Sequence, residues 1–288
     1  MRGEQIGSLH ITRCQRRNRH EVRELTAHNY YSHVHLDWQE TDQWLDEEAA
    51  PIRLAWQHGR LIGVLATSAP FQQTCWIRLA AVRDHHDADW VLKALWDDIK
   101  VELRALGVHT VAWLLIRDWP MAFAEQLGFR PTEEIVTLRR SDQSAPPDMS
   151  DKRLLIRLSR EEDLPLMVAV DQAAFSPPWQ MTLRELRQAE RSAAHCTVAE
   201  RSGVIVGYQL STLYFDGSHL ARLAVAPAEQ GQGVGSQLLS EALRYFARRG
   251  VYSTTVNTQA SNLTSQRLYQ RFGFRHNGFN LPVWTAHL

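Results

Sequence analysis

The sequence repeats itself across its midpoint, and this repeat limits the possible folds more than any other feature. Glycines, an Arg-Leu-Ala triplet and a Gly-Phe-Arg triplet each recur at a nearly constant distance. The matches are Gly59 with Gly203 and Gly63 with Gly207 at 144 residues (203 − 59), Arg78-Leu79-Ala80 with Arg222-Leu223-Ala224 at 144 (222 − 78), and Leu127 to Arg130 with Phe272 to Arg275 at 145 (272 − 127). A spacing kept over so long a stretch indicates two copies of one structural unit.

A polar segment near the middle separates the two copies. Residues 141–151 contain Pro146-Pro147 and lack apolar periodicity, which is typical of a linker. The chain has 288 residues, about twice the commonest domain size. We therefore expect a first domain at residues 1–140, a linker at 141–151 and a second domain at 152–288.

Hydrophobic periodicity predicts the same order of elements in each half. In the second half the predicted strands are residues 154–158, 197–200, 205–214, 219–225, 253–258 and 281–285, and the predicted helices are residues 161–174, 181–191, about 235–250 and 263–271. This order predicts two tandem α/β domains, each with a mixed, mostly antiparallel sheet flanked by helices.

Composition excludes several classes of partner. The 32 Lys and Arg residues balance the 32 Asp and Glu residues, so no net field favours nucleic acid or an anionic membrane. No apolar run approaches the roughly 20 residues that a membrane span needs, and the N-terminus lacks the apolar segment of a secretory signal. Cys14, Cys75 and Cys196 are odd in number and far apart, which favours free thiols in a reducing cytoplasm over disulfides or a zinc site.

A glycine-rich turn lies between the strand ending at Val225 and the next helix. Glycine stands at every second position of Gln230-Gly231-Gln232-Gly233-Val234-Gly235. Glycine permits a positive φ and lets a phosphate approach the backbone N–H groups, and the following helix adds its positive end and the Ser236 hydroxyl. The spacing fits neither the dinucleotide fingerprint nor the P-loop. The turn predicts a pyrophosphate site, with a tight structural turn as the alternative.

The pattern Gln-x-x-Gly-x-Gly at Gln230 to Gly235, after the strand LARLAV and before Asn262 and LYQRFGF, resembles the GCN5-related N-acetyltransferase (GNAT) family over about residues 152–280. The resemblance implies that acetyl-CoA, or a related acyl-CoA, is the cosubstrate, and no metal is expected. The stretch from Ala174 to Leu186 is similar to the ribosomal-protein alanine acetyltransferase branch of the family. The tandem arrangement also resembles mycothiol synthase.

The family resemblance assigns the acyl-CoA contacts to three segments. The pyrophosphate would contact Gln230, Gly231, Gln232, Gly233, Val234, Gly235 and Ser236, and the pantetheine would lie along Leu223, Ala224 and Val225, where the sheet splays open, with a further contact to Asn262. The N–H of Val225 would be the oxyanion donor. Asn262 also opens a helix, so an ordinary N-cap is the alternative reading.

Tyr269 stands where the family places the tyrosine that donates to the departing CoA sulfur. A phenol with a pKa near 10 suits this role. Packing in the core beside Phe272 and Phe274 is the alternative. We expect Tyr269 to be a catalytic residue and also to contact the cofactor.

The general base departs from the family pattern, because relatives often carry a glutamate where this sequence has His219 and Asn257. Asn257 cannot accept a proton. A histidine with a pKa near 6.5 can act as a base directly or through water, so His219 is the candidate. A solvated histidine in a turn is the alternative.

The first half lacks these features. Asp84 to Asp89 takes the place of the phosphate turn, without glycine and with three carboxylates that would repel a pyrophosphate. Arg117 stands in place of Asn262, and Ala124 in place of Tyr269. This half is predicted to be a degenerate copy that does not bind CoA. A metal reading of its Asp/His run is disfavoured, because adjacent histidines rarely face one site.

These observations predict an N-acetyltransferase that moves an acetyl group from acetyl-CoA to a primary amine of a small molecule or a peptide, by direct attack. The alternative is a non-catalytic, acyl-CoA-responsive scaffold for a protein partner. Retention of Asn262 and Tyr269 beside the glycine turn favours the enzyme, and the missing acidic base favours the scaffold.

Overall fold

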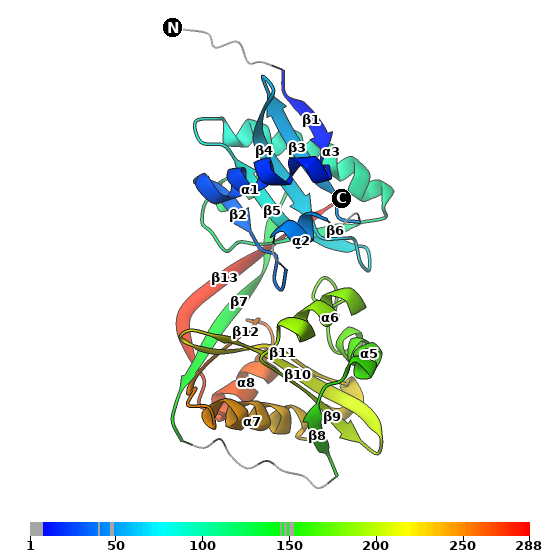
Figure 1. The fold of residues 1–288 in the computed structure, drawn as a ribbon, viewed down its shortest axis with the longest axis vertical. Helices are drawn as coiled ribbons and strands as arrows, with labels where there is room; N and C mark the ends of the chain where they lie inside the picture. The colour runs from blue at the N-terminus through cyan, green and yellow to red at the C-terminus, as the bar shows by residue number, and fades with distance from the viewer. Residues whose placement is uncertain (1–7, 40, 47–48, 145, 147–148, 150–152) are drawn as a thin grey trace. The chain divides into compact units, whose positions relative to one another are not determined.

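A computed structural model describes residues 8–39, 41–46, 49–144, 146, 149 and 153–288. The chain forms two compact units (Figure 1). The first comprises Met1–Thr132 together with Leu281–Leu288, and the second comprises Glu133–Asn280. The expected linker at 141–151 begins at the last residue of a strand, and several of its positions lie outside the described residues.

The first unit contains a mixed sheet in the order β1-β3-β4-β5-β6-β13, with β2 paired to β5. Its strands are β1 (His10–Arg13), β2 (Tyr31–Val34), β3 (Ile52–Gln57), β4 (Arg60–Thr67), β5 (Thr74–Val82), β6 (Thr110–Leu114) and the end of β13 (Arg275–His287). Its helices are η1 (Arg16–Asn18), α1 (Arg19–His28), α2 (Thr41–Leu45), α3 (Ala88–Ala105) and α4 (Met121–Ala124). The β5–β6 pair is parallel, whereas the pairs β1–β3, β3–β4, β4–β5, β2–β5 and β6–β13 are antiparallel.

The second unit repeats this plan in the order β7-β12-β11-β10-β9-β8. Its strands are β7 (Arg130–Ser141), β8 (Leu155–Leu158), β9 (His195–Arg201), β10 (Val204–Tyr214), β11 (Gly217–Val225) and β12 (Ser253–Gln259). Its helices are η2 (Glu161–Asp163), α5 (Leu164–Ala174), α6 (Leu183–Ser192), η3 (Pro227–Glu229), α7 (Val234–Ala247) and α8 (Leu263–Arg271). Here β11–β12 is the parallel pair. The predicted fold class, α/β with mixed, mostly antiparallel sheets, is confirmed.

Helices cover both faces of the sheet in the second unit. On β10, the hydroxyl of Tyr208 reaches Asp171 of α5, whereas a Cβ on the neighbouring Gly207 would meet Val234 and Leu238 of α7. Neighbouring strand residues point to opposite faces, so α5 and α7 lie on opposite sides. Among the described residues, none of the helices combines the length and apolar character needed to cross a bilayer.

The recurring glycines Gly63 and Gly207 have the same packing role in the two units. A Cβ on Gly63 would lie 2.4 Å from Val91 Cγ1 of α3, and a Cβ on Gly207 would lie 3.1 Å from Val234 Cγ1 of α7. In each unit the missing side chain lets the helix after the central strand pack closely on the sheet.

The pairing of the central strands β5 and β11 shows that the match of Arg78-Leu79-Ala80 with Arg222-Leu223-Ala224 is wrong by one residue. Val82 pairs with Gly63 and Val225 pairs with Gly207, so the equivalent strand residues are 143 apart (225 − 82), not 144. Leu79, not Arg78, is therefore equivalent to Arg222. The hairpin between β10 and β11 is one residue shorter than the hairpin between β4 and β5. The paired residues Thr67 and Ile77 lie ten apart (77 − 67), whereas the equivalent pair, Ser211 and Leu220, lies nine apart (220 − 211). The repeated triplet concealed this deletion.

The two units exchange their last strands. Residues 135–141 of β7 follow the helices of the first unit but pair with β12 of the second. Residues 283–287 of β13 end the chain but pair with β6 of the first unit. The sequence division at 152–288 placed this last strand in the second domain, and the structure corrects it. Alternation of apolar residues predicts a strand but not the sheet that it joins.

This exchange predicts how the chain can be cut. A fragment of residues 152–288 lacks β7 and exposes the edge of β12, so we expect it to aggregate or to melt without a cooperative transition. A fragment of residues 133–280 keeps every strand of the second unit and should unfold cooperatively. Circular dichroism melts of the two fragments check this, and a cooperative melt of the 152–288 fragment would contradict the exchange.

Candidate functional site

The glycine turn of the second unit has the backbone that its sequence predicts. Gly231 and Gly233 have φ of +76° and +85°, and a Cβ on either would meet nothing within 4 Å. Gly233 is the N-cap of α7, and no side chain caps this helix start. The first-turn N–H groups of α7 are therefore left for an anion, and their partial positive charge favours one.

The glutamine side chains of the turn hydrogen-bond to neighbouring strands and stabilise it. Gln230 Nε2 donates to Val225 O at 3.1 Å, and Gln232 accepts from Arg201 Nη1 at 2.6 Å. Arg201 also pairs with Glu229 at 2.6 Å. These bonds fix the loop without using its backbone N–H groups, so the turn holds its shape without a ligand.

The strand β11 opens along one edge just before this turn. Its parallel pairing with β12 covers only Ser218 to Leu220, whereas its pairing with β10 continues to Val225. Ala226 N donates to Val206 O at 2.9 Å, and pairs in an antiparallel ladder alternate between bonded and unbonded. The N–H and C=O groups of Val225 and Leu223 therefore face the open edge, and Gln230 takes only the Val225 carbonyl.

Three elements converge at the end of this edge. A Cβ on Gly235, in the first turn of α7, would lie 3.4 Å from Leu268 Cδ2 of α8 and 3.7 Å from Val225 Cγ2 of β11. Val234 and Ser236, in the same turn, are buried. The fold thus brings the predicted phosphate turn, the predicted pantetheine edge and the helix carrying Tyr269 into contact.

Tyr269 is a core residue that packs among apolar side chains. Its ring packs 5.8 Å from that of Phe274, in a cluster that includes Leu220 and Phe272. Burial raises its pKa, so the phenol stays protonated at neutral pH. None of the hydrogen bonds among the described residues uses this hydroxyl. Packing of the ring and donation by the hydroxyl are therefore compatible.

Asn262 caps α8, since its side chain accepts from Ser265 N at 3.0 Å. This is the structural role that the sequence offered as an alternative. The bond occupies only the carbonyl oxygen of the amide. Its NH₂ group makes no hydrogen bond with the residues that the structure describes.

His219 lies on β11, half-buried, with Nδ1 2.9 Å from Thr255 Oγ1. The Thr255 hydroxyl donates in turn to Ser218 O at 3.4 Å, so its oxygen is left to accept from Nδ1–H. This arrangement puts the proton on Nδ1 and leaves Nε2 as the basic nitrogen. Burial lowers the pKa of His219 to about 4, which keeps the ring neutral at neutral pH.

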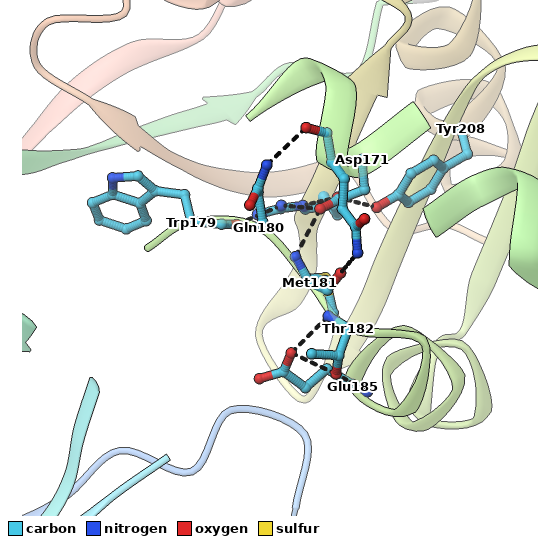
Figure 2. A network of polar contacts seen from close by, with 9 residues as sticks. Asp171, Trp179, Gln180, Met181, Thr182, Glu185 and Tyr208 are labelled. Atoms are coloured by element: carbon cyan, nitrogen blue, oxygen red, sulfur yellow. Dashed lines mark hydrogen bonds and ion pairs between the residues drawn. The ribbon is translucent and has the colours of Figure 1, made fainter. Parts of the chain in front are cut away.

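A buried ion-pair network beside the open edge was not predicted from the sequence (Figure 2). Arg222 of β11 donates from Nε and Nη2 to the two oxygens of Asp171, at 2.7 and 2.8 Å. Asp171 and Tyr208 are fully buried, and the Tyr208 hydroxyl donates to the same carboxylate at 2.5 Å. One indication of this network was present in the sequence, namely an aspartate next to the apolar Val170 in a predicted amphipathic helix.

The network also fixes the segment that joins α5 to α6. Arg222 Nη2 donates to Trp179 O at 2.7 Å, and its guanidinium lies 3.7 Å from the centre of the Phe175 ring. Met181 N donates to Asp171 at 2.8 Å (Figure 2). Gln172 Nε2 donates to Met181 O at 3.1 Å, and Gln180 Nε2 donates to Gln172 O at 2.8 Å. Residues 175–182 therefore form a fixed loop tied to α5 and to one residue of β11.

The corresponding residues of the first unit do not form such a site. Ala124 is buried in α4, and Arg117 is exposed after β6. Asp84 accepts from Tyr30 N at 3.0 Å, and Asp87 caps α3. In the described part of the chain, no three His, Cys, Asp or Glu side chains are grouped so as to hold a metal ion.

Comparison with known proteins places this site in a family. Residues 164–274 match the model of the acetyltransferase (GNAT) family. A putative ribosomal protein bS18 alanine N-acetyltransferase of Bacillus subtilis is 25% identical over 130 residues, which cover 45% of this chain and 86% of that protein. A mycothiol acetyltransferase of Acidimicrobium ferrooxidans is 29% identical over 216 residues, covering 69% of this chain and 70% of that one.

Solved structures share the tandem fold. A tandem GNAT protein of the clavulanic acid biosynthesis pathway has a TM-score of 0.66 at 16% identity, covering 97% of this chain and 98% of its own. A probable N-acyltransferase of Enterococcus faecalis has a TM-score of 0.71 at 12% identity, covering 96% of this chain and 72% of its own. At these identities the likeness concerns the fold.

The ion-pair network predicts an unequal response to substitution. Asp171→Ala leaves the partly buried Arg222 guanidinium without its partner, and should lower the free energy of unfolding by about 3–5 kcal/mol. Tyr208→Phe removes one hydrogen bond to the carboxylate and should cost about 1.5–3 kcal/mol. Urea unfolding of both variants checks this order. Equal losses would mean that the Arg222–Asp171 pair does not bear the structural role described.

Proposed function

This chain is a tandem acetyltransferase of the GNAT family, and from that premise we propose that its second unit transfers an acetyl group from acetyl-CoA to a primary amine. The observation that carries the proposal is the convergence of an uncapped glycine turn with the open edge of β11. An anion and an extended amide chain are the two chemical groups that these features bind, and acetyl-CoA contains both.

In this proposal the pyrophosphate binds the glycine turn and the pantetheine pairs with the strand edge. The pyrophosphate contacts are Gln230, Gly231, Gln232, Gly233, Val234, Gly235 and Ser236. The amides of the pantetheine bond the N–H and C=O groups of Leu223 that face the open edge, and its chain continues along Ala224 to Val225. The NH₂ group of Asn262 adds a contact from the start of α8.

Three groups then promote direct attack of the amine on the thioester. The N–H of Val225 stabilises the negative charge that develops on the carbonyl oxygen. His219 takes the amine proton on Nε2, directly or through water. Tyr269 hydrogen-bonds the departing sulfur. Its raised pKa suits a donor that keeps its proton, because full transfer to a thiolate would be uphill.

The acceptor is proposed to be a small molecule or a peptide, held against the loop of residues 175–182. Relatives named for each of these acceptor classes match this chain. The loop carries Phe175 and Trp179 beside Arg222, which suits an amine with apolar neighbours. Free Cys14, Cys75 and Cys196 suit a reducing compartment, so we assign the protein to the cytoplasm.

A pair of variants that match in shape and differ in charge tests the pyrophosphate site. Asp and Asn both tolerate the positive φ of Gly233 and have nearly the same shape, so the pair isolates charge. Gly233→Asp should bind acetyl-CoA at least about tenfold more weakly than Gly233→Asn, because it adds a negative charge next to the pyrophosphate. Titration calorimetry and thermal shift check this, and equal affinities would exclude the turn as the site.

The role of Tyr269 is tested by removing its hydroxyl. Tyr269→Phe should lower kcat by about 10–100-fold with the KM for acetyl-CoA within about twofold, because the bond forms as the thiolate departs. Release of free CoA in the presence of amine and peptide acceptors provides the assay. An unchanged kcat would transfer the role to another group or to water. If the wild type shows no acceptor-dependent release of CoA, the result would instead favour the scaffold function.

A further inference from the structure

In the first unit, the strand β2 occupies one edge of β5. Residues Tyr31–Val34 pair antiparallel with Leu79–Val82, next to the point where β6 ceases to pair after Trp76 (Figure 1). His35 N donates to Arg78 O at 2.9 Å. By the alternation of an antiparallel ladder, the hydrogen-bonded pairs are then His33 with Ala80 and Tyr31 with Val82.

This edge is equivalent to the open edge of the second unit. Val82 corresponds to Val225 and Ala80 to Leu223, both at a distance of 143 (225 − 82 and 223 − 80). The same backbone groups that face the open edge on β11 are therefore bonded to β2 on β5. The first unit fills with its own main chain the position that the proposed function gives to the pantetheine.

The segment equivalent to β2 in the second unit cannot form this strand. Over this part of the repeat the distance is 145, as shown by β1 with β8 (155 − 10) and by buried Leu25 with buried Val170 (170 − 25). At the ends of the helices the distance becomes 146, because α1 ends at His28 and α5 at Ala174 (174 − 28), so Pro177 and Pro178 stand at the positions of Tyr31 and Ser32. A proline has no N–H to donate to a ladder, so the hydrogen bond that Tyr31 makes in its pair with Val82 is not available to Pro177.

The phosphate position of the first unit is filled in a similar way. Val91 and Val234 pack on equivalent glycines, so residues 88–90 correspond to 231–233 (234 − 91 is 143). Residues 88–90 form the first turn of α3, whereas 231–233 form the glycine turn. The side chain of Asp87 accepts from Trp90 N at 3.2 Å and caps this helix start. A carboxylate of the chain itself thus takes the place of a bound anion.

The strand β2 is a packed part of the unit. The His33 side chain is fully buried, and its ring lies 5.7 Å from that of Trp113. Trp119 Nε1 donates to Ser32 O at 3.1 Å, and the Tyr31 ring packs 5.6 Å from that of Trp119. Burial lowers the pKa of His33 to about 3, so the ring remains neutral and does not drive the strand out at neutral pH.

We propose that the first unit is closed to acyl-CoA by its own chain, with β2 in place of the pantetheine and Asp87 in place of a phosphate, so that the protein binds one acyl-CoA. The identification of these two positions rests on the proposed function of the second unit. The closure itself is a property of the first unit, and it can be measured without a ligand.

Hydrogen exchange of individual amides in the full-length protein tests the closure. Without ligand, the amides of His33, Ala80 and Val82 should exchange at least about 100-fold more slowly than those of Leu223 and Val225. Acetyl-CoA should slow exchange at Leu223 and Val225 and leave Ala80 and Val82 unchanged. Fast exchange at His33, or slowing at Ala80 and Val82 by acetyl-CoA, would overturn the proposal. If acetyl-CoA changes neither edge, the proposed function fails while the closure stands.

Two variants and a titration complete the test. The double variant Ser32→Pro/His33→Pro removes the N–H that His33 donates to β5 and should speed exchange at Ala80 and Val82 at least about tenfold, whereas Ser32→Ala/His33→Ala keeps both N–H groups and should not. Unchanged exchange in a folded proline variant would show that β2 does not hold the edge. Calorimetric titration of the wild type should give one equivalent of acetyl-CoA, and a second equivalent would also overturn the closure. If the proline variant does not fold, the wild-type measurements decide.

Discussion

A strand that loses its neighbour halfway along its length exposes backbone N–H and C=O groups, and both units are built around such a strand. β5 and β11 each leave their parallel partner after three paired residues, Trp76 and Leu220 being the last. Groups left exposed in this way need a hydrogen-bonding partner or water. In the first unit a segment of the same chain supplies the partner. In the second unit the edge is open, and a ligand with amide groups can take it.

The segment after the first helix decides between these two outcomes. In the first unit this segment contains the aromatic Tyr31 and the β-branched Val34, which favour a strand, and it pairs as β2. In the second unit Pro177 and Pro178 remove the donors, and Arg222 with Asp171 holds the segment to α5. A buried ion pair is a costly way to gain stability, because both charges must be desolvated. The role of Arg222 is instead to position its neighbours, because one guanidinium holds Trp179 O, the Phe175 ring and the carboxylate of Asp171 together.

Much of this architecture is encoded locally and could be predicted from the sequence. Alternating and helical periodicities predicted the strands and helices of the second unit, and the alternate glycines predicted the turn before α7. The positive φ of Gly231 and Gly233 and the cap formed by Asn262 follow from residue type alone. The prediction was wrong where pairing between distant segments decides. The match of Arg78 with Arg222 missed a one-residue deletion, and periodicity did not identify the sheet that β13 joins. The Arg222–Asp171 pair joins residues 51 apart, which no local pattern records.

The exchanged strands give a physical reason why a closed first unit persists beside an open one. The sheet of the second unit is completed by β7, which follows the last helix of the first unit, and the sheet of the first is completed by the end of the chain. Each sheet therefore depends on the other half of the chain for one strand, and loss of that strand would uncover an edge that promotes aggregation. The loop and the strand edge that would bind a ligand can differ between the two copies without disturbing these exchanged strands. In the first unit Asp87 and β2, which belong to the same chain, bond the backbone groups that a ligand would otherwise bond. The fold of the first unit is thus held by strand pairing that is independent of acyl-CoA.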